Sequence, residues 1–392
     1  MSVERSWTGV GAVGGWQVVA SSTYYSVFAA TAAVSREFQV TQYQIGILLA
    51  VLTLGYTLFL FPAGAVVDGY GDRPTMVLGL GLLSVGAVTI SAASSFQILL
   101  VAAFVLGASY ASAMPATNRA IAARAPHGRY NLAIGVKQVG VTTGSAIASI
   151  FVTNATRVGG TWRTAFFAVG VVAGIVAVGT LFGYRGTGGS GSMELPDIRG
   201  LRANRTYVLL TVAGFFVGSA IFTTTGYMVP YLEASGASVQ IAGIALATMQ
   251  VSGSAGRIGV GEFADRLPGS PEAGALRVML AQMGTAAALF LVLPLAGVST
   301  KFVLVAVLGV SLLGVTGLYH GTLVRMVPDD EAGAATAGGQ TMINLGGLVA
   351  PPAFGLVADA AGFQVGWRVL AVGSFLSATF LAVAIRSSRG GG

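Results

Sequence analysis

The amino-acid sequence predicts an all-α membrane protein with twelve transmembrane helices in two parallel six-helix repeats. Three observations carry this prediction. Hydrophobic residues make up 54% of the 392-residue chain and charged residues only 9%, whereas a soluble globular chain carries about 25% charged residues. Apolar runs long enough to cross a bilayer follow one another along the whole chain. Finally, short patterns of the first half return in the second half, as internal repeats do.

The predicted spans are the runs that reach the length a helix needs to cross the hydrocarbon core, about 20 residues. They cover 9–33, 43–67, 75–94, 97–122, 131–153, 164–184, 206–231, 240–263, 275–296, 301–324, 333–357 and 367–386. The Gly- and Ser-rich stretch 185–205 predicts a cytoplasmic linker. It separates an N-terminal six-helix bundle, 1–184, from a C-terminal one, 206–392.

The basic residues set the expected orientation, because cytoplasmic loops of membrane proteins are enriched in Lys and Arg. With the N-terminus inside, fourteen of the 21 basic residues fall in inner segments and five in outer segments. We therefore expect a multi-pass protein of the cell membrane with both termini cytoplasmic. The other two basic residues, Lys137 and Arg257, fall inside predicted spans.

Composition and spacing argue against several classes of function. The net charge is +7, but the basic residues form no stripe with interleaved aromatic residues, so no nucleic-acid partner is expected. With no cysteine and only two distant histidines, no metal site is expected. Neither a nucleophile–base pair nor a channel filter is visible. We expect no enzyme activity and no cofactor, and we expect a monomer.

The repeats indicate how the two halves are related. The matches at a shift of 202 residues are Pro126 with Pro328, Gln138 with Gln340, and Gly144 with Gly346. Because each half has an even number of spans, both halves enter the membrane from the same side as parallel repeats. Lys137 falls on Gly339, so the first half adds a positive charge to a scaffold that both halves share.

The segment 64–74, between the second and third spans, resembles the loop motif of the major facilitator superfamily, G-x-x-x-D-R-x-G-R-R/K. Gly64 and Asp68 match it, Gly69 stands where Arg is usual, and Arg73 alone represents the final basic pair. A second copy keeps Asp265 and its neighbouring arginine. Together with twelve spans and a central linker, this resemblance covers the whole chain and implies the fold of that superfamily.

A finer resemblance is to the organic-anion branch, which includes monocarboxylate, oxalate/formate and cyanate-type transporters. It rests on Asn118-Arg119, on Lys137-Gln138 within a Gly-rich run, and on Gly256-Arg257. In that branch a basic residue of the eighth helix contacts the substrate carboxylate, a role that would carry over to Arg257. Ala103 and the pair Val141-Thr142 replace residues that drug efflux proteins have, which lowers the drug-efflux interpretation.

The two basic residues that fall inside predicted spans are the main indication of function. Lys137 and Arg257 each lie six residues, or about 9 Å, from the expected inner boundary. A charge at the bilayer centre costs at least about 2.5–3.5 kcal/mol, and such residues are functional by default. The resemblance implies that both cations look into one cavity, where an anionic ligand would supply the counter-charge. The alternative is that each side chain reaches toward water or that Arg257 turns toward Glu262 or Asp265.

Neutral polar residues of the predicted spans complete the expected substrate site. The candidates are Gln138, Gln250, Asn118, His320, Tyr24, Tyr25, Tyr227, Gln340 and Asn344, beside Lys137 and Arg257. Each alone is more often an interhelical hydrogen bond than a ligand contact. The candidate gating residues are Gly64, Asp68, Arg73, Arg129, Asp265 and Arg266. Among these we expect a cytoplasmic latch in which Arg129 pairs with Asp265 or another acid.

The sequence therefore predicts a secondary transporter that moves a small organic or pseudohalide anion by alternating access. A co-transported proton, passive uniport and anion exchange remain open. Two other functions also stay open at this point. One is efflux of neutral or amphipathic compounds, with Lys137 and Arg257 structural, and the other is a solute sensor with a transporter fold.

Overall fold

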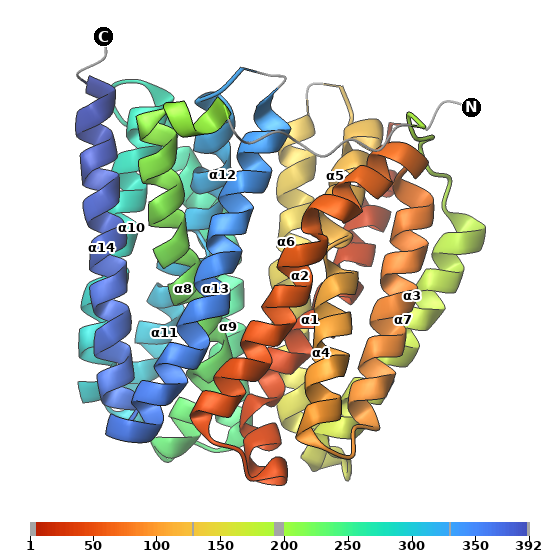
Figure 1. Ribbon diagram of the computed structural model, residues 1–392, viewed down its shortest axis with the longest axis vertical. Coiled ribbons are helices and arrows are strands. Elements are labelled where there is room, and N and C mark those ends of the chain that lie inside the picture. The colour runs from red at the N-terminus through yellow and green to blue at the C-terminus, as the bar shows by residue number, and fades with distance from the viewer. Residues whose placement is uncertain (1–4, 128, 192–199, 329–330, 390–392) are drawn as a thin grey trace. The chain divides into compact units, whose positions relative to one another are not determined.

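The computed structural model describes residues 5–127, 129–191, 200–328 and 331–389, and the elements within these ranges are helical. Contacts divide the chain into two compact units, unit 1 (residues 1–38 and 51–195) and unit 2 (residues 39–50 and 196–392). The α-helices that begin before the linker are α1 (Trp7–Phe38), α2 (Gln42–Tyr70), α3 (Asp72–Ser91), α4 (Phe96–Tyr110), α5 (Ala113–Arg124), α6 (Tyr130–Asn154) and α7 (Trp162–Gly183). Those after it are α8 (Arg205–Ala234), α9 (Val239–Asp265), α10 (Pro271–Val292), α11 (Val298–Leu312), α12 (Val315–Arg325), α13 (Ala332–Ala361) and α14 (Phe363–Arg389). Within each unit the long helices run alongside one another (Figure 1).

Two predicted spans are broken helices. The expected run 97–122 is α4 and α5, which are separated only by Ala111 and Ser112, and the run 301–324 is α11 and α12, separated by Leu313 and Gly314. The two breaks lie 202 residues apart, the same shift that relates the sequence motifs. Counting each broken pair as one segment, the described chain contains twelve long helical segments. The repeat inferred from sequence therefore includes the position of the helix break in each half.

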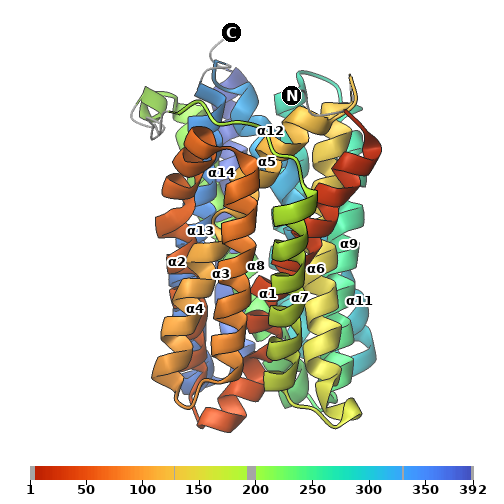
Figure 2. The same cartoon turned by 90° about the vertical axis from the view of Figure 1, so that its right-hand side faces the viewer.

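Matching glycines bring matching helices together. A Cβ on Gly144 of α6 would lie 2.4 Å from the carbonyl oxygen of Val18 in α1, and one on Gly346 of α13 would lie 2.0 Å from that of Phe215 in α8. Only a residue without a side chain permits such an approach of two backbones. The contact of α1 with α6 in unit 1 thus repeats as that of α8 with α13 in unit 2. Figure 2 shows α1 beside α6.

The polarity of the helices sets three of them apart. Among the described residues, nine helical segments are long and apolar enough to cross a membrane by length and composition. The long helices outside this group are α1, α6 and α9. They carry Gln17, Lys137, Gln250 and Arg257, so the lower hydropathy coincides with the candidate polar sites. The number of true membrane crossings and the side on which the termini lie stay predictions.

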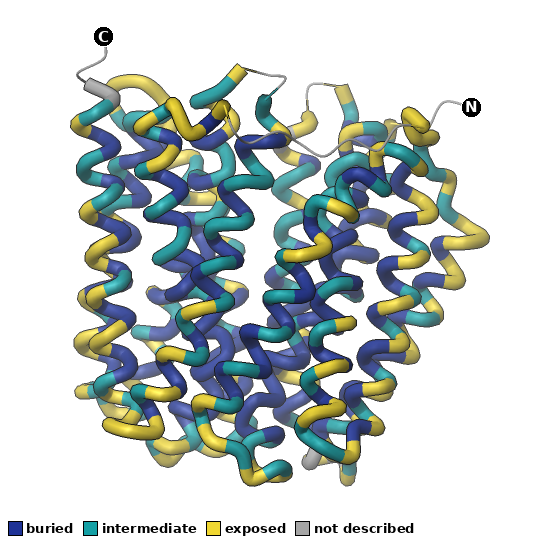
Figure 3. The backbone as a smooth tube through the Cα atoms, in the orientation of Figure 1, coloured by how far each residue is buried: buried dark blue, intermediate teal, exposed yellow. Residues whose placement is uncertain are grey.

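Apolar side chains cover the outer faces of many helices. Phe182, Val101 and Leu295 are examples, with 82%, 66% and 76% of their surface exposed. Buried and exposed positions alternate along the helices (Figure 3). A surface this apolar is stable only in contact with lipid or another protein, in agreement with the composition.

Candidate functional site

The buried ammonium group of Lys137 is the clearest candidate functional feature of unit 1. Lys137 lies on α6 and only 1% of its surface is exposed. Its Nζ donates a hydrogen bond of 2.8 Å to Oδ1 of Asn118 on α5. The amide oxygen is a neutral acceptor, so this contact orients the ammonium group without neutralising it. The half-buried Gln138 follows Lys137 on the same helix.

A hydrogen-bonded network links the helices next to this lysine. Gln17 of α1 donates to Ser21 (3.0 Å), and its Oε1 accepts from the Thr117 hydroxyl (3.1 Å). The Ser21 hydroxyl lies 2.9 Å from that of Tyr110 at the end of α4. Gly140, three residues after Lys137, packs directly against the Gln17 side chain. Sequence reasoning missed this set, because Gln17, Thr117 and Tyr110 belong to no recognisable motif.

Two predicted tyrosines extend the network into an aromatic cluster. The ring of Tyr24 stacks on that of Tyr110 at 4.2 Å between centroids, and Tyr25 meets Tyr24 edge to face at 5.1 Å. Tyr56 of α2 also packs against Tyr24. The four rings form one packed aromatic cluster, since each contacts at least one other ring.

In unit 2, Arg257 lies at the break between α11 and α12. Its Nε donates to the carbonyl oxygen of Leu313 at 3.0 Å. The amide of Gln282 on α10 similarly donates to the carbonyl of Val310 at 3.0 Å. Side chains that bond the backbone groups freed at a helix break stabilise that break within a membrane. Arg257 therefore has a structural contact within unit 2, and Glu262 pairs with Arg266. The alternative that Arg257 turns toward Glu262 or Asp265 stays a prediction.

Among the described residues of unit 2, the side-chain amides of Asn344 and Gln250 each have an NH₂ group without a hydrogen-bond acceptor. Gln340 donates to Oδ1 of Asn344 at 2.8 Å, which leaves the Nδ2 of the fully buried Asn344 without an acceptor among the described residues. The same holds for Nε2 of Gln250, which is 2% exposed. An unsatisfied buried polar group costs about 1–3 kcal/mol. These two amide groups are therefore candidate hydrogen-bond donors to a ligand.

The remaining candidate substrate residues make backbone contacts. The hydroxyl of Tyr227 lies within 2.6 and 3.0 Å of the carbonyl oxygens of Gln42 and Pro351, so this buried tyrosine ties segments of unit 2 together. Nδ1 of His320 donates to the carbonyl of Thr316 at 2.9 Å, within α12. These contacts suit a structural role as well as a ligand role.

The predicted gating residues lie at helix ends. Asp68 lies one turn after Gly64 on α2; it is exposed and pairs with Arg119 at 3.3 Å. Arg73 donates a hydrogen bond to the carbonyl oxygen of Leu181. Asp265 is the exposed last residue of α9, and Arg266, the next residue, pairs with Glu262 one turn earlier. Exposed Arg129 precedes α6. The expected pairing of Arg129 with Asp265 joins residues of the two units and stays a prediction.

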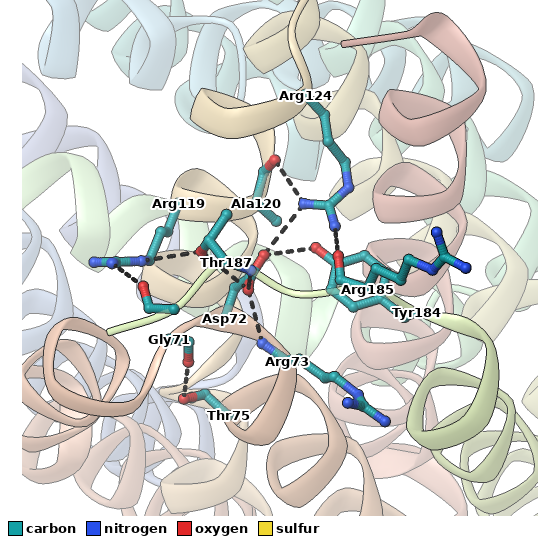
Figure 4. Close-up of polar contacts among 11 residues, drawn as sticks. Gly71, Asp72, Arg73, Thr75, Arg119, Ala120, Arg124, Tyr184, Arg185 and Thr187 are labelled. Atoms are coloured by element: carbon teal, nitrogen blue, oxygen red, sulfur yellow. Dashed lines mark hydrogen bonds and ion pairs between the residues drawn. The ribbon is translucent and has the colours of Figure 1, made fainter. Parts of the chain in front are cut away.

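Asp72, which is not among the candidate residues predicted from sequence, is the buried centre of a network at the start of α3 (Figure 4). Its carboxylate accepts from Arg124 Nη1 (3.2 Å), from the Tyr184 hydroxyl (2.7 Å) and from the backbone N–H of Thr187 (2.6 Å). Burial, and then the neighbouring Asp72 charge, raise the pKa of Tyr184 well above its ordinary value, so the phenol stays neutral and donates. Asp72 stands where the loop motif has a basic residue, which was the available signal.

The network fastens the beginning of the predicted linker to unit 1. Arg119 donates to the carbonyl of Gly188 at 2.6 Å, and Arg124 donates to that of Arg185. The backbone N–H of Ser190 donates to the carbonyl of Asp68 at 2.7 Å. The first residues of the linker are thus held in place, whereas 192–199 lie outside the described residues.

Comparison with known sequences shows that the chain is similar to transporters. A probable sulfoacetate transporter of Cupriavidus necator, SauU, is 25% identical over 380 residues, covering 88% of this chain and 86% of that protein. An uncharacterized MFS-type transporter of Mycobacterium tuberculosis is 22% identical over 335 residues, covering 83% of this chain and 74% of that protein.

Solved structures agree on the fold. A bacterial homolog of the human lysosomal transporter Spinster has a TM-score of 0.81 and 16% identity, with 96% of each chain covered. The nucleoside transporter NupG has a TM-score of 0.79 and 13% identity, with 96% of this chain and 99% of that chain covered. Residues 12–337 match the Major Facilitator Superfamily as a family. The chain is a membrane-embedded secondary transporter that belongs to the Major Facilitator Superfamily.

Proposed function

We propose that this transporter carries a small organic or pseudohalide anion across the cell membrane by alternating access, with Lys137 as the main anion-binding residue. The observation that carries the proposal is the buried ammonium group of Lys137, which Asn118 Oδ1 orients at 2.8 Å. A charge placed inside a membrane protein is expensive and marks substrate pathways. A negatively charged ligand that reaches this group would offset part of the cost.

The unsatisfied amide donors of unit 2 support the same class of substrate. Nε2 of Gln250 and Nδ2 of Asn344 are buried donors that lack an acceptor in the described structure. Carboxylate, sulfonate and cyanate groups have acceptors and no donors, so they match these amides. The similarity to a probable sulfoacetate transporter adds weight to an organic anion. In this proposal the two amides are candidate donors to the substrate within unit 2.

Uptake into proteoliposomes tests the proposal. Labelled sulfoacetate, oxalate, formate, lactate and cyanate are offered to the wild type and to Lys137→Gln and Lys137→Arg variants. Lys301→Gln is the matched control, because Lys301 is also buried and donates to Ser235 at 2.7 Å. We expect Lys137→Gln to lose most uptake, Lys137→Arg to retain part of it, and Lys301→Gln to behave like the wild type. Equal uptake of an anion by wild type and Lys137→Gln would refute the role of Lys137.

Efflux of neutral or amphipathic compounds is a second candidate, favoured by the contact of Arg257 with the broken helix. The bond from Nε to the carbonyl of Leu313 needs no ligand, so Arg257 can serve the fold alone. If transport is of this kind, a neutral dye should be exported equally by the wild type and by Lys137→Gln. An anion-specific loss in that variant argues for the first candidate instead.

A further inference from the structure

Unit 2 has an open groove on its surface that none of the candidate transport residues lines. It lies along α9, α10 and α11 and has a volume of about 320 Å³. Its walls are mainly apolar and include Phe263, Leu267, Val278, Ala281, Val307 and Val310. Large apolar side chains of the rim are exposed, 59% for Phe263 and 39% for Val307. In a membrane protein such a rim faces acyl chains.

One end of the groove carries a cation. Arg277 lines it six residues into α10, where Nη1 donates to the carbonyl of Pro268 in the α9–α10 turn at 2.7 Å. Gly269 of the same turn has φ +110° and lies against the guanidinium group. No carboxylate among the described residues forms an ion pair with Arg277. A guanidinium group has five N–H donors, so donors remain for an external anion.

The dimensions of the groove suit one lipid chain. From Arg277 to Thr285, which both line the groove, α10 rises by about 12 Å at 1.5 Å per residue. One leaflet contributes about half of the ~30 Å hydrocarbon core. A headgroup at Arg277 would therefore leave an acyl chain lying along most of the depth of one leaflet.

A second groove, in unit 1, shows what the cation adds. It runs between α3 and α4, has a volume of about 460 Å³ and is lined by residues such as Val85, Ile98 and Val101, without a charged side chain. Such a groove could take any acyl chain. The groove of unit 2 differs because it joins an apolar wall to a positive charge at the helix end, and basic pockets between membrane helices bind anionic headgroups.

We propose that the α9–α10–α11 groove is a binding site for one anionic phospholipid, with its phosphate on Arg277 and an acyl chain against Phe263, Ala281 and Val307. The bound lipid is distinct from the transported substrate. It covers the apolar rim and supplies an anionic partner for Arg277, which has no ion pair among the described residues.

Native mass spectrometry of the detergent-purified full chain tests this site with phosphatidylglycerol and phosphatidylcholine of identical acyl chains. One basic residue near an anionic headgroup corresponds to about a fivefold preference. We expect the wild type and Arg277→Lys to retain phosphatidylglycerol about fivefold better than phosphatidylcholine, and Arg277→Gln to lose the preference. Ala281→Trp, which fills the groove, should reduce retention of both lipids.

Matched controls separate the site from general effects. Arg205→Gln removes an exposed charge at the start of α8, and Val101→Trp fills the groove of unit 1. Arg205→Gln should retain phosphatidylglycerol like the wild type, and Val101→Trp should keep the preference for phosphatidylglycerol over phosphatidylcholine, about fivefold. The proposal is overturned if the wild type retains both lipids equally, if Arg277→Gln keeps the preference, or if inorganic phosphate alone displaces the lipid. If Ala281→Trp misfolds, the comparison of Arg277→Lys with Arg277→Gln still tests the proposal.

Discussion

Replacing Asp72 by Asn should lower the stability of unit 1 far more than the loss of an exposed ion pair would. Asp72 and Arg124 form a pair whose side chains are 0% and 6% exposed. The substitution leaves the Arg124 guanidinium buried without its counter-charge, and it turns an NH₂ group toward donors that now bond a carboxylate. Breaking a buried pair by removing one partner costs about 3–5 kcal/mol.

The matched control is the neighbouring pair of Asp68 and Arg119, whose side chains are 62% and 30% exposed. Exposed pairs contribute about 0–1 kcal/mol, so Asp68→Asn should lower stability little. Unfolding in detergent is measured for Asp72→Asn, Arg124→Gln, the double variant and Asp68→Asn. The double variant should lose less than the sum of its single changes, because the two groups share one interaction.

Trypsin provides a second readout for the same network. Because Arg124 holds the carbonyl of Arg185 and Asp72 holds Thr187, cleavage after Arg185 should be faster in Asp72→Asn than in the wild type. If Asp72→Asn unfolds like Asp68→Asn and is cleaved at the wild-type rate, the network does not fasten the linker and the reasoning is refuted.

Three further predictions concern packing, capping and the amide donors. Gly346→Ala should lower the free energy of unfolding by at least about 1–3 kcal/mol, because its Cβ would lie 2.0 Å from the carbonyl oxygen of Phe215. Gly179→Ala, with open space around it, should be tolerated, and thermal unfolding compares the two variants. Asp359→Ala should cost about 1 kcal/mol and speed amide exchange at Gln42 and Tyr43, because its carboxylate accepts from both N–H groups at the start of α2 (2.9 and 2.8 Å); unchanged exchange would contradict this. Gln250→Met should keep or raise stability, because it removes a buried unsatisfied donor. The same change should weaken substrate binding by about 1.5–3 kcal/mol. Loss of stability with unchanged binding would show that the amide serves the fold.

Much of the fold was predictable because membrane spans and repeats leave local signals. Length and apolar composition give the long helices, and the 202-residue shift predicts which of them correspond. Gly144 and Gly346 illustrate this, since both bring a helix against the backbone of its partner. The helix breaks at 111–112 and 313–314 were not predicted, because apolar residues continue on both sides. Pro115, which cannot donate a backbone hydrogen bond to the carbonyl of Ala111, was the available signal for the first break, whereas no proline marks the second.

The candidate site was predictable only in part. Lys137 and Asn118 stand out as polar residues in apolar runs, but their contact depends on how α5 packs against α6. The role of Asp72 could not be inferred, because Tyr184 and Thr187 lie more than a hundred residues away in sequence and meet it only in the folded unit. Contacts across such separations come from packing, which short motifs do not encode.

Binding of the transported anion to purified protein tests the central role of Lys137 most directly. Once uptake has identified the substrate, isothermal titration gives Kd for the wild type, Lys137→Arg and Lys137→Gln. Truncating one partner of a buried charge pair costs about 2–5 kcal/mol, so we expect Kd to rise at least about 30-fold in Lys137→Gln and less in Lys137→Arg. An unchanged Kd in Lys137→Gln would contradict the account.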